Sequence, residues 1–139
     1  MKIIVFIIGV LLSISTQAQS ILGQWETYDD KTNTKKAIIE IYKQEDVYFA
    51  KIVKNFVRAE DAVCEKCEGT KHNQPIIGLV IIENLKKNAD EFDGGTILDP
   101  ESGDVYKCYL KLIEENKLKV RGFIGFSLIG RTQYWLRKK

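Results

Sequence analysis

Two cysteines separated by two residues form the motif whose spacing points most directly to chemistry. Cys64 and Cys67 lie in a polar segment that also holds His72, the single His of the chain. A closed structural zinc site needs four ligands, and Cys108 would complete such a set. Redox chemistry of the thioredoxin type needs the pair at a helix N-terminus in a βαβ unit, which this sequence does not offer. A disulfide between Cys64 and Cys67 is the interpretation we favour for an exported chain, with no metal.

The remaining candidates for catalysis are weak. Cys108 falls on the apolar face of a strand-like segment, as a buried small side chain or as an alternative disulfide partner for one loop cysteine. His72 stands alone in a polar loop, where a histidine is usually solvated. The serines lie in no nucleophile-elbow motif. We therefore predict no catalytic residue and no cofactor.

Two arginines lie in segments rich in Gly and Phe that are otherwise typical of a protein interior. Arg121 and Arg131 would then need a partner, because a buried guanidinium must be paired or hydrogen-bonded. One interpretation is structural, with the arginine closing an end of the fold against a carboxylate or Trp25. The other is an anchor for a ligand carboxylate or phosphate, which Arg binds through two parallel hydrogen bonds. The predicted ligand-binding residues are Arg121, Arg131, Tyr106, Phe123 and Trp135.

The elements that must position these residues are almost all strands. Apolar and polar residues alternate at a period of two, and no stretch has a clear helical period. A polar segment at 58–75, which holds the Cys pair, is expected to be a long loop with at most one helical turn. The predicted strands are 22–29, 36–42, 47–56, 76–83, 92–98, 105–113, 118–124 and 131–137.

Short turns between about eight strands predict an all-β fold, either an up-and-down antiparallel barrel or a sandwich. An eight-stranded barrel encloses packed side chains or one small ligand. The segment from Asp99 to Gly103 (DPESG) has the residue order of a type I turn with a bulge, in which Asp99 would shape the turn through a side-chain hydrogen bond.

Composition is that of one ordinary domain. The 139 residues are 45% hydrophobic and 29% charged, with a net charge of +2, which excludes a disordered chain. Because 21 basic residues face 19 acidic ones without a separate basic block, a nucleic-acid partner is not expected.

The first 18 residues (MKIIVFIIGVLLSISTQA) have the features of a secretory signal peptide. Lys2 precedes a short apolar run, and Thr16 and Ala18 are small residues at the usual cleavage spacing. An uncleaved anchor is the alternative. We predict cleavage after Ala18, a single mature domain at 19–139 without a membrane span, and a periplasmic or secreted location.

Gly23 and Trp25 form a Gly-x-Trp motif at the start of the first strand of the mature chain. Together with an Arg in the last strand, this pattern resembles the lipocalin-type (calycin) barrel. The resemblance implies that an Arg packs across the Trp and closes one end of the barrel, a contact worth about 0.5–2 kcal/mol. Arg137 or Arg131 would supply it, and the structural residues are expected to be Gly23, Trp25, Arg137 and Asp99.

A longer ordered set of motifs resembles the domain of unknown function 2147 family, which consists of small exported bacterial proteins. The motifs are GQW at 23–25, CEKC at 64–67, PIIG at 75–78, GGTILDP at 94–100 followed by SG, YKC at 106–108, RGFIG at 121–125, and GRTQ at 130–133 with Trp135. The resemblance implies a lipocalin-like barrel and an envelope location, and it implies no reaction.

These features of the sequence are compatible with three functions. The leading one is an uncharacterised envelope protein that binds a small apolar or amphipathic ligand inside a β-barrel. The alternative is a protein–protein interaction module of the envelope that uses the Cys-bearing loop on a protein partner. The third is an enzyme, an isomerase or a hydrolase, that acts on a small apolar substrate.

Overall fold

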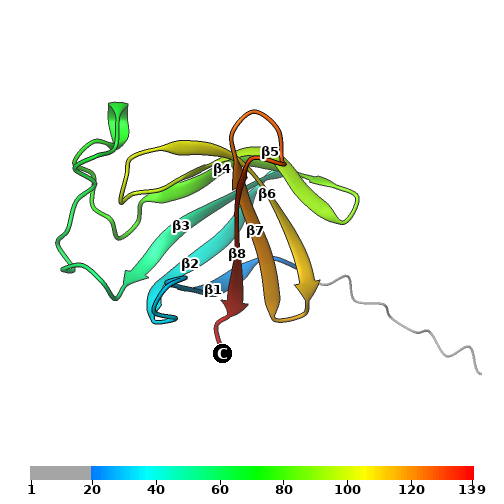
Figure 1. Ribbon diagram of the computed structural model, residues 1–139, viewed down its shortest axis with the longest axis horizontal. Coiled ribbons are helices and arrows are strands. Elements are labelled where there is room, and N and C mark those ends of the chain that lie inside the picture. The colour runs from blue at the N-terminus through cyan, green and yellow to red at the C-terminus, as the bar shows by residue number, and fades with distance from the viewer. Residues whose placement is uncertain (1–19) are drawn as a thin grey trace, which may run out of the picture.

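The computed structural model describes residues 20–139, so the predicted signal peptide lies outside the described residues. This part of the chain forms eight strands and one short 3-10 helix (Figure 1). The strands are β1 (Gly23–Tyr28), β2 (Lys35–Gln44), β3 (Val47–Asn55), β4 (Val80–Asn88), β5 (Glu91–Leu98), β6 (Val105–Glu114), β7 (Lys117–Phe123) and β8 (Gly130–Arg137), and the 3-10 helix is η1 (Gly69–Lys71).

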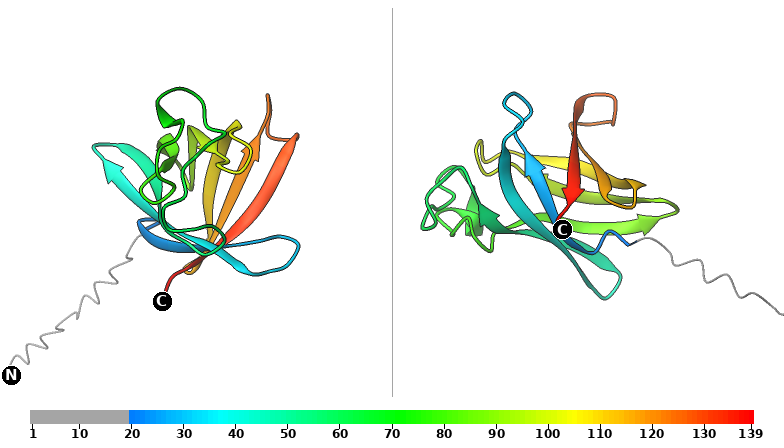
Figure 2. Two further views of the ribbon diagram at one scale, coloured as in Figure 1. Left: turned by 90° about the vertical axis from the view of Figure 1, so that its left-hand side faces the viewer. Right: turned by 90° about the horizontal axis from the view of Figure 1, so that it is seen from below.

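Each strand pairs antiparallel with the next, and β8 returns to pair with β1. The result is a closed up-and-down barrel, which confirms the predicted fold class and excludes the sandwich. The β1–β8 pairing is short, because only Trp25 opposite Arg137 and Glu26 opposite Leu136 are in register. The two strands diverge beyond these pairs, toward the end from which the β1–β2 and β7–β8 turns project (Figure 2, right).

Alternation along the strands places the core inside the barrel. On β6, Cys108 and Leu110 are buried, and on β7 so are Leu118 and Val120, whereas the intervening residues are more exposed. Side chains at a period of two share one face of a strand, so each strand contributes one apolar row to the interior. The barrel core therefore follows directly from the pattern in the sequence.

The apolar run at 76–83 is only partly a strand, because β4 begins at Val80. Ile76 and Leu79 are buried although they precede the strand, and the Ile76 amide donates to the carbonyl of Ala62 in the long loop. Ile76 and Leu79 belong to the hydrophobic core of the barrel, which explains why they are apolar although they precede the strand. β4 instead continues as far as Asn88, through polar residues that the sequence pattern assigns to a connection.

The long loop is held by the disulfide between Cys64 and Cys67, whose Cα atoms are 5.4 Å apart. Both sulfurs are therefore unavailable as zinc thiolates, and the zinc interpretation fails. The Cys64 sulfur lies 3.7 Å from the carbonyl oxygen of Pro100 in the β5–β6 turn. In the same turn Gly103 has a φ of +78°, and a Cβ there would collide with the backbone of Lys66. The loop is thus packed closely against this turn.

Cys108 is a buried free thiol, and burial raises its pKa to about 12. The neutral thiol is a poor nucleophile. We expect iodoacetamide at mildly alkaline pH to leave the folded protein unmodified and to add one group after unfolding in denaturant without reductant, read by intact mass. Modification of the folded protein at a rate close to that of the unfolded chain would contradict this placement.

Candidate functional site

One end of the barrel is closed by an aromatic–cation contact. Trp25 is fully buried, and its indole Nε1 donates to the carbonyl of Ile21 at 2.8 Å. The guanidinium carbon of Arg137 lies 4.3 Å from the centroid of the Trp25 ring. Gly23, with a φ of +114°, lies beside this contact, and a Cβ there would come to 3.9 Å from Arg137 Nη1. The indole and the guanidinium together fill the space where β1 meets β8.

Arg137 also ties three separate segments together through its hydrogen bonds. Its Nη2 donates to the carbonyl of Ser20 at 2.7 Å, and its Nη1 donates to that of Leu22 at 3.2 Å. Its Nε and Nη2 donate to the carbonyl of Glu115 in the β6–β7 turn, at 3.1 and 3.0 Å. The chain before β1, the last strand and the β6–β7 turn are therefore joined at one side chain.

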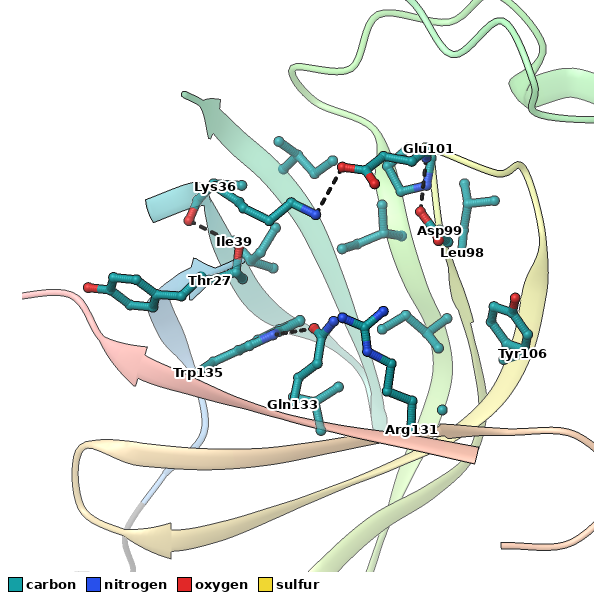
Figure 3. Close-up of a pocket in the computed structure, with 18 of the residues that line it drawn as sticks. Thr27, Lys36, Ile39, Leu98, Asp99, Glu101, Tyr106, Arg131, Gln133 and Trp135 are labelled. Carbon is teal, nitrogen blue, oxygen red and sulfur yellow. Dashed lines mark hydrogen bonds and ion pairs between the residues drawn. The ribbon is translucent and has the colours of Figure 1, made fainter. Parts of the chain in front are cut away.

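Away from this closed end lies an apolar cavity of about 500 Å³. Its volume is within the range of small-molecule sites. Its walls come from strands on all sides of the barrel and include Leu98 and Tyr106 (Figure 3). The aliphatic and aromatic lining includes Ile39, Ile52, Ile81, Ile97, Val120 and Trp135.

One strand supplies a row of lining residues with increasing polarity toward the opening. On β8, Trp135 is buried, Gln133 is partly buried and Arg131 is exposed, and all three line the cavity. Figure 3 shows them in sequence along the strand, with Trp135 Nε1 donating to Gln133 Oε1 at 3.4 Å. The cavity therefore offers an apolar base, an amide at intermediate depth and a cation at its mouth.

The mouth carries two ion pairs, each of which joins a strand residue to a carboxylate in a turn. Lys36 Nζ lies 2.9 Å from Glu101 Oε1, and Arg131 Nη2 pairs with Asp30 Oδ2. Exposed pairs of this kind contribute little to stability, typically about 0–1 kcal/mol. A ligand anion that offered both cations a new partner would therefore displace the two carboxylates at small cost.

Asp99 and Tyr106 shape the rim beside these pairs. Asp99 Oδ1 accepts from the Glu101 amide at 2.9 Å, which is the predicted side-chain hydrogen bond of the β5–β6 turn. The Tyr106 hydroxyl donates to Asp104 Oδ2 at 3.3 Å. Partial burial and the Asp104 carboxylate raise the pKa of Tyr106.

The predicted ligand-binding residues divide between cavity and outer surface. The cavity is lined by four of them, Tyr106, Phe123, Arg131 and Trp135. The sequence predicted a buried Arg131, but its side chain is exposed. Arg121 is outside the lining, contrary to the prediction of a ligand anchor. The reason is strand alternation, because Arg121 lies between two inward positions of β7 and so faces outward.

Gln133 and Lys36 are among the polar cavity residues that the sequence analysis did not single out. Gln133 lies two positions from Trp135 on the same strand, so alternation would have placed it inward. Lys36 gave no such signal, because it is the extra residue of β2 at the register shift beside Thr27 and Tyr28 of β1, where simple alternation is interrupted.

Within residues 20–139, no group of three or more His, Cys, Asp or Glu side chains is arranged to hold a metal ion. In the same part of the chain, no helix is long and apolar enough to cross a membrane.

An eight-stranded antiparallel barrel with a Trp–Arg closure at one end and an apolar cavity opening at the other defines a lipocalin-like protein. The solved structure of protein HP1028 from the human pathogen Helicobacter pylori, which belongs to the lipocalin family, is similar with a TM-score of 0.77. The identity is 14%, over 88% of this chain and 85% of that one. A redesigned beta barrel matches with a TM-score of 0.47 and 13% identity, over 85% of this chain and 90% of that one.

The chain belongs to the DUF2147 family, described as uncharacterized protein conserved in bacteria, whose profile matches residues 23–137. The resemblance to this family that the sequence indicated is thus confirmed. No curated protein matches the chain significantly.

Proposed function

We propose that this protein binds one small amphipathic molecule, with its apolar part inside the barrel and an acidic group at the mouth. The observation that carries the proposal is the row Trp135, Gln133 and Arg131 along one wall of an apolar cavity of about 500 Å³. Apolar surface removed from water supplies the affinity. The guanidinium and Lys36 would orient the ligand, since carboxylates and phosphates form strong charge-assisted hydrogen bonds with such groups.

The Cys-bearing loop supports this function rather than a separate one. Val57, Arg58 and Ile76, at or next to this loop, line the cavity, and the disulfide packs against the β5–β6 turn at the rim. The loop therefore forms part of the wall. The position of the loop in the cavity wall is explained by ligand binding. Among the described residues, no contact of the loop calls for a protein partner.

The head-group preference can be tested with a fluorescent fatty acid, cis-parinaric acid, and the corresponding alcohol. We expect the acid to bind more tightly than the alcohol to the wild-type protein. Arg131→Gln is expected to weaken binding of the acid at least about tenfold, because it removes a charge-assisted hydrogen bond worth about 1.5–3 kcal/mol, and to leave the alcohol unchanged. Titration of probe fluorescence measures both affinities.

Lys54→Gln is the matched control, because Lys54 is an exposed cation on β3 that does not line the cavity. Its affinity for the acid should equal that of the wild type. Equal losses for acid and alcohol in Arg131→Gln would contradict a charged head at the mouth. Absence of binding for both probes in the wild-type protein would argue against an amphipathic ligand.

We further propose that residues 1–18 are removed and that the mature domain acts in the periplasm or outside the cell. The apolar run after Lys2 and the small residues near Ala18 support export. The disulfide between Cys64 and Cys67 is compatible with an oxidising compartment. The intact mass of protein isolated from its own cells reports the cleavage point.

A further inference from the structure

The β7–β8 loop presents apolar side chains to solvent. No charged residue lies between Arg121 and Arg131. Figure 2 (right) shows the loop projecting beside the β1–β2 turn. Clustered exposed apolar side chains mark interaction sites, whereas scattered ones are normal. The exposed fractions are 64% for Ile124, 59% for Phe126, 84% for Leu128 and 57% for Ile129.

Hydrogen bonds hold this loop in one shape. Arg121 reaches it from the outer face of β7, where its Nε donates to the carbonyl of Ser127 at 2.7 Å and its Nη1 donates to Thr132 Oγ1 at 2.8 Å. The amide of Ile124 donates to the carbonyl of Ile129 at 3.0 Å. The apolar tip is therefore presented in a fixed conformation, which reduces the entropy lost when it binds.

The outer wall below the loop is basic. Strand pairing places Lys111 beside Lys119 and Tyr109 beside Arg121. The outward positions of β6, β7 and β8 between 105 and 136 carry no carboxylate. Lys111 alone among these cations has an acidic partner within 4 Å in the described chain, Asp90 at 3.3 Å. This basic face consists of Lys107, Lys111, Lys117, Lys119 and Arg121.

Aromatic rings lie among these cations. Lys117 Nζ is 4.8 Å from the centroid of the Tyr134 ring, and Lys119 Nζ is 5.4 Å from that of Tyr109. Tyrosine prefers the boundary between an apolar phase and water, because one end of its ring is apolar and the other is polar. The basic face thus has the composition of a surface that meets lipid head groups.

We propose that this surface docks on an anionic lipid membrane, with the β7–β8 loop entering the acyl region and the basic face on the head groups. The cations would attract anionic head groups, and the tip residues Phe126 and Leu128 would be buried among the adjoining acyl chains. Ile124 and Ile129 belong both to the loop and to the cavity lining, so docking brings the mouth to the lipid surface. This docking is independent of whether the cavity holds a ligand.

Sedimentation with lipid vesicles tests the proposal. The wild-type protein is expected to bind vesicles of phosphatidylglycerol mixed with phosphatidylcholine and to bind pure phosphatidylcholine far more weakly. High salt should release it, because the Debye length falls to about 3 Å at 1 M salt. Phe126→Ser with Leu128→Ser should weaken binding at least about tenfold. Lys107→Gln with Lys119→Gln should weaken it about fivefold for each charge removed.

Matched controls remove positive charges or an exposed apolar side chain from parts of the barrel outside the proposed docking surface. Lys43→Gln with Lys54→Gln removes two exposed charges from β2 and β3, and Leu22→Ser removes an exposed apolar side chain at the closed end. Both should bind vesicles as the wild type does. Ala37→Trp, which places an indole in the cavity, should also bind vesicles normally, so a failure of ligand binding does not affect this test.

Two results would overturn the proposal. One is absence of vesicle binding by the wild-type protein, or equal binding to neutral and anionic vesicles. The other is self-association that depends on Phe126 and Leu128, measured by light scattering without lipid, because it would assign the loop to a second copy of the chain.

Discussion

Replacement of Trp25 with Ala is expected to lower the free energy of unfolding by about 3–5 kcal/mol, the usual cost of truncating a buried Trp. Trp25 is fully buried, and its ring packs under the Arg137 guanidinium where the first and last strands meet. The in-register β1–β8 pairs lie at this point, so the cavity left by the indole would weaken the closure of the barrel. Urea unfolding followed by circular dichroism measures the change.

Arg137→Lys is the informative companion variant. It keeps the charge but loses the planar guanidinium that donates to Ser20, Leu22 and Glu115. We expect an intermediate loss, of about 1–3 kcal/mol, since those backbone carbonyls lose their donors. A Trp25→Ala protein as stable as the wild type would contradict the closure described here.

Ala37→Trp is expected to abolish ligand binding while leaving the barrel folded. Ala37 lines the cavity from β2, opposite Thr27 on β1 and Asn55 on β3, so an indole at this position would extend into open space. Overpacking of a filled core costs about 1–3 kcal/mol, and here the cost should stay below about 1.5 kcal/mol because the space is empty. Affinity for cis-parinaric acid should fall roughly hundredfold or more, because the apolar part of the ligand loses its site.

Ala37→Ser serves as the control, since it changes polarity with little change in volume. It should keep stability and bind the probe within a few-fold of the wild type. Loss of folding in Ala37→Trp would show that the interior is filled by side chains. Full retention of binding would show that the probe binds elsewhere.

The barrel could be predicted from the sequence because its strands alternate cleanly. Cys108 and Leu110, or Leu118 and Val120, already mark the inner face of a strand by their spacing. The start of β4 could not be predicted, because Ile76 and Leu79 are buried in the core although the backbone there is not yet a strand. Hydrophobicity reports burial, and burial does not require a strand.

The candidate site was predictable only in part. Trp135 and Arg131, both expected from the sequence to contact a ligand, share one face of β8 and line the cavity. Arg121 lies outside the cavity lining, because it faces outward on β7 between the inward positions Val120 and Gly122, and an apolar neighbourhood in the sequence does not reveal which face a residue takes. The cavity itself depends on how side-chain volumes from all the strands sum inside the barrel, and no single segment of sequence carries that information.

Native mass spectrometry on protein isolated from its own cells without denaturation tests the central claim most directly. We predict a wild-type protein that carries one small molecule, lost on collisional activation, with the Cys64–Cys67 bond intact. Ala37→Trp isolated in the same way should be bare. A wild-type protein that is also bare, or an Ala37→Trp protein that carries the same molecule, would contradict a ligand-binding cavity inside this barrel.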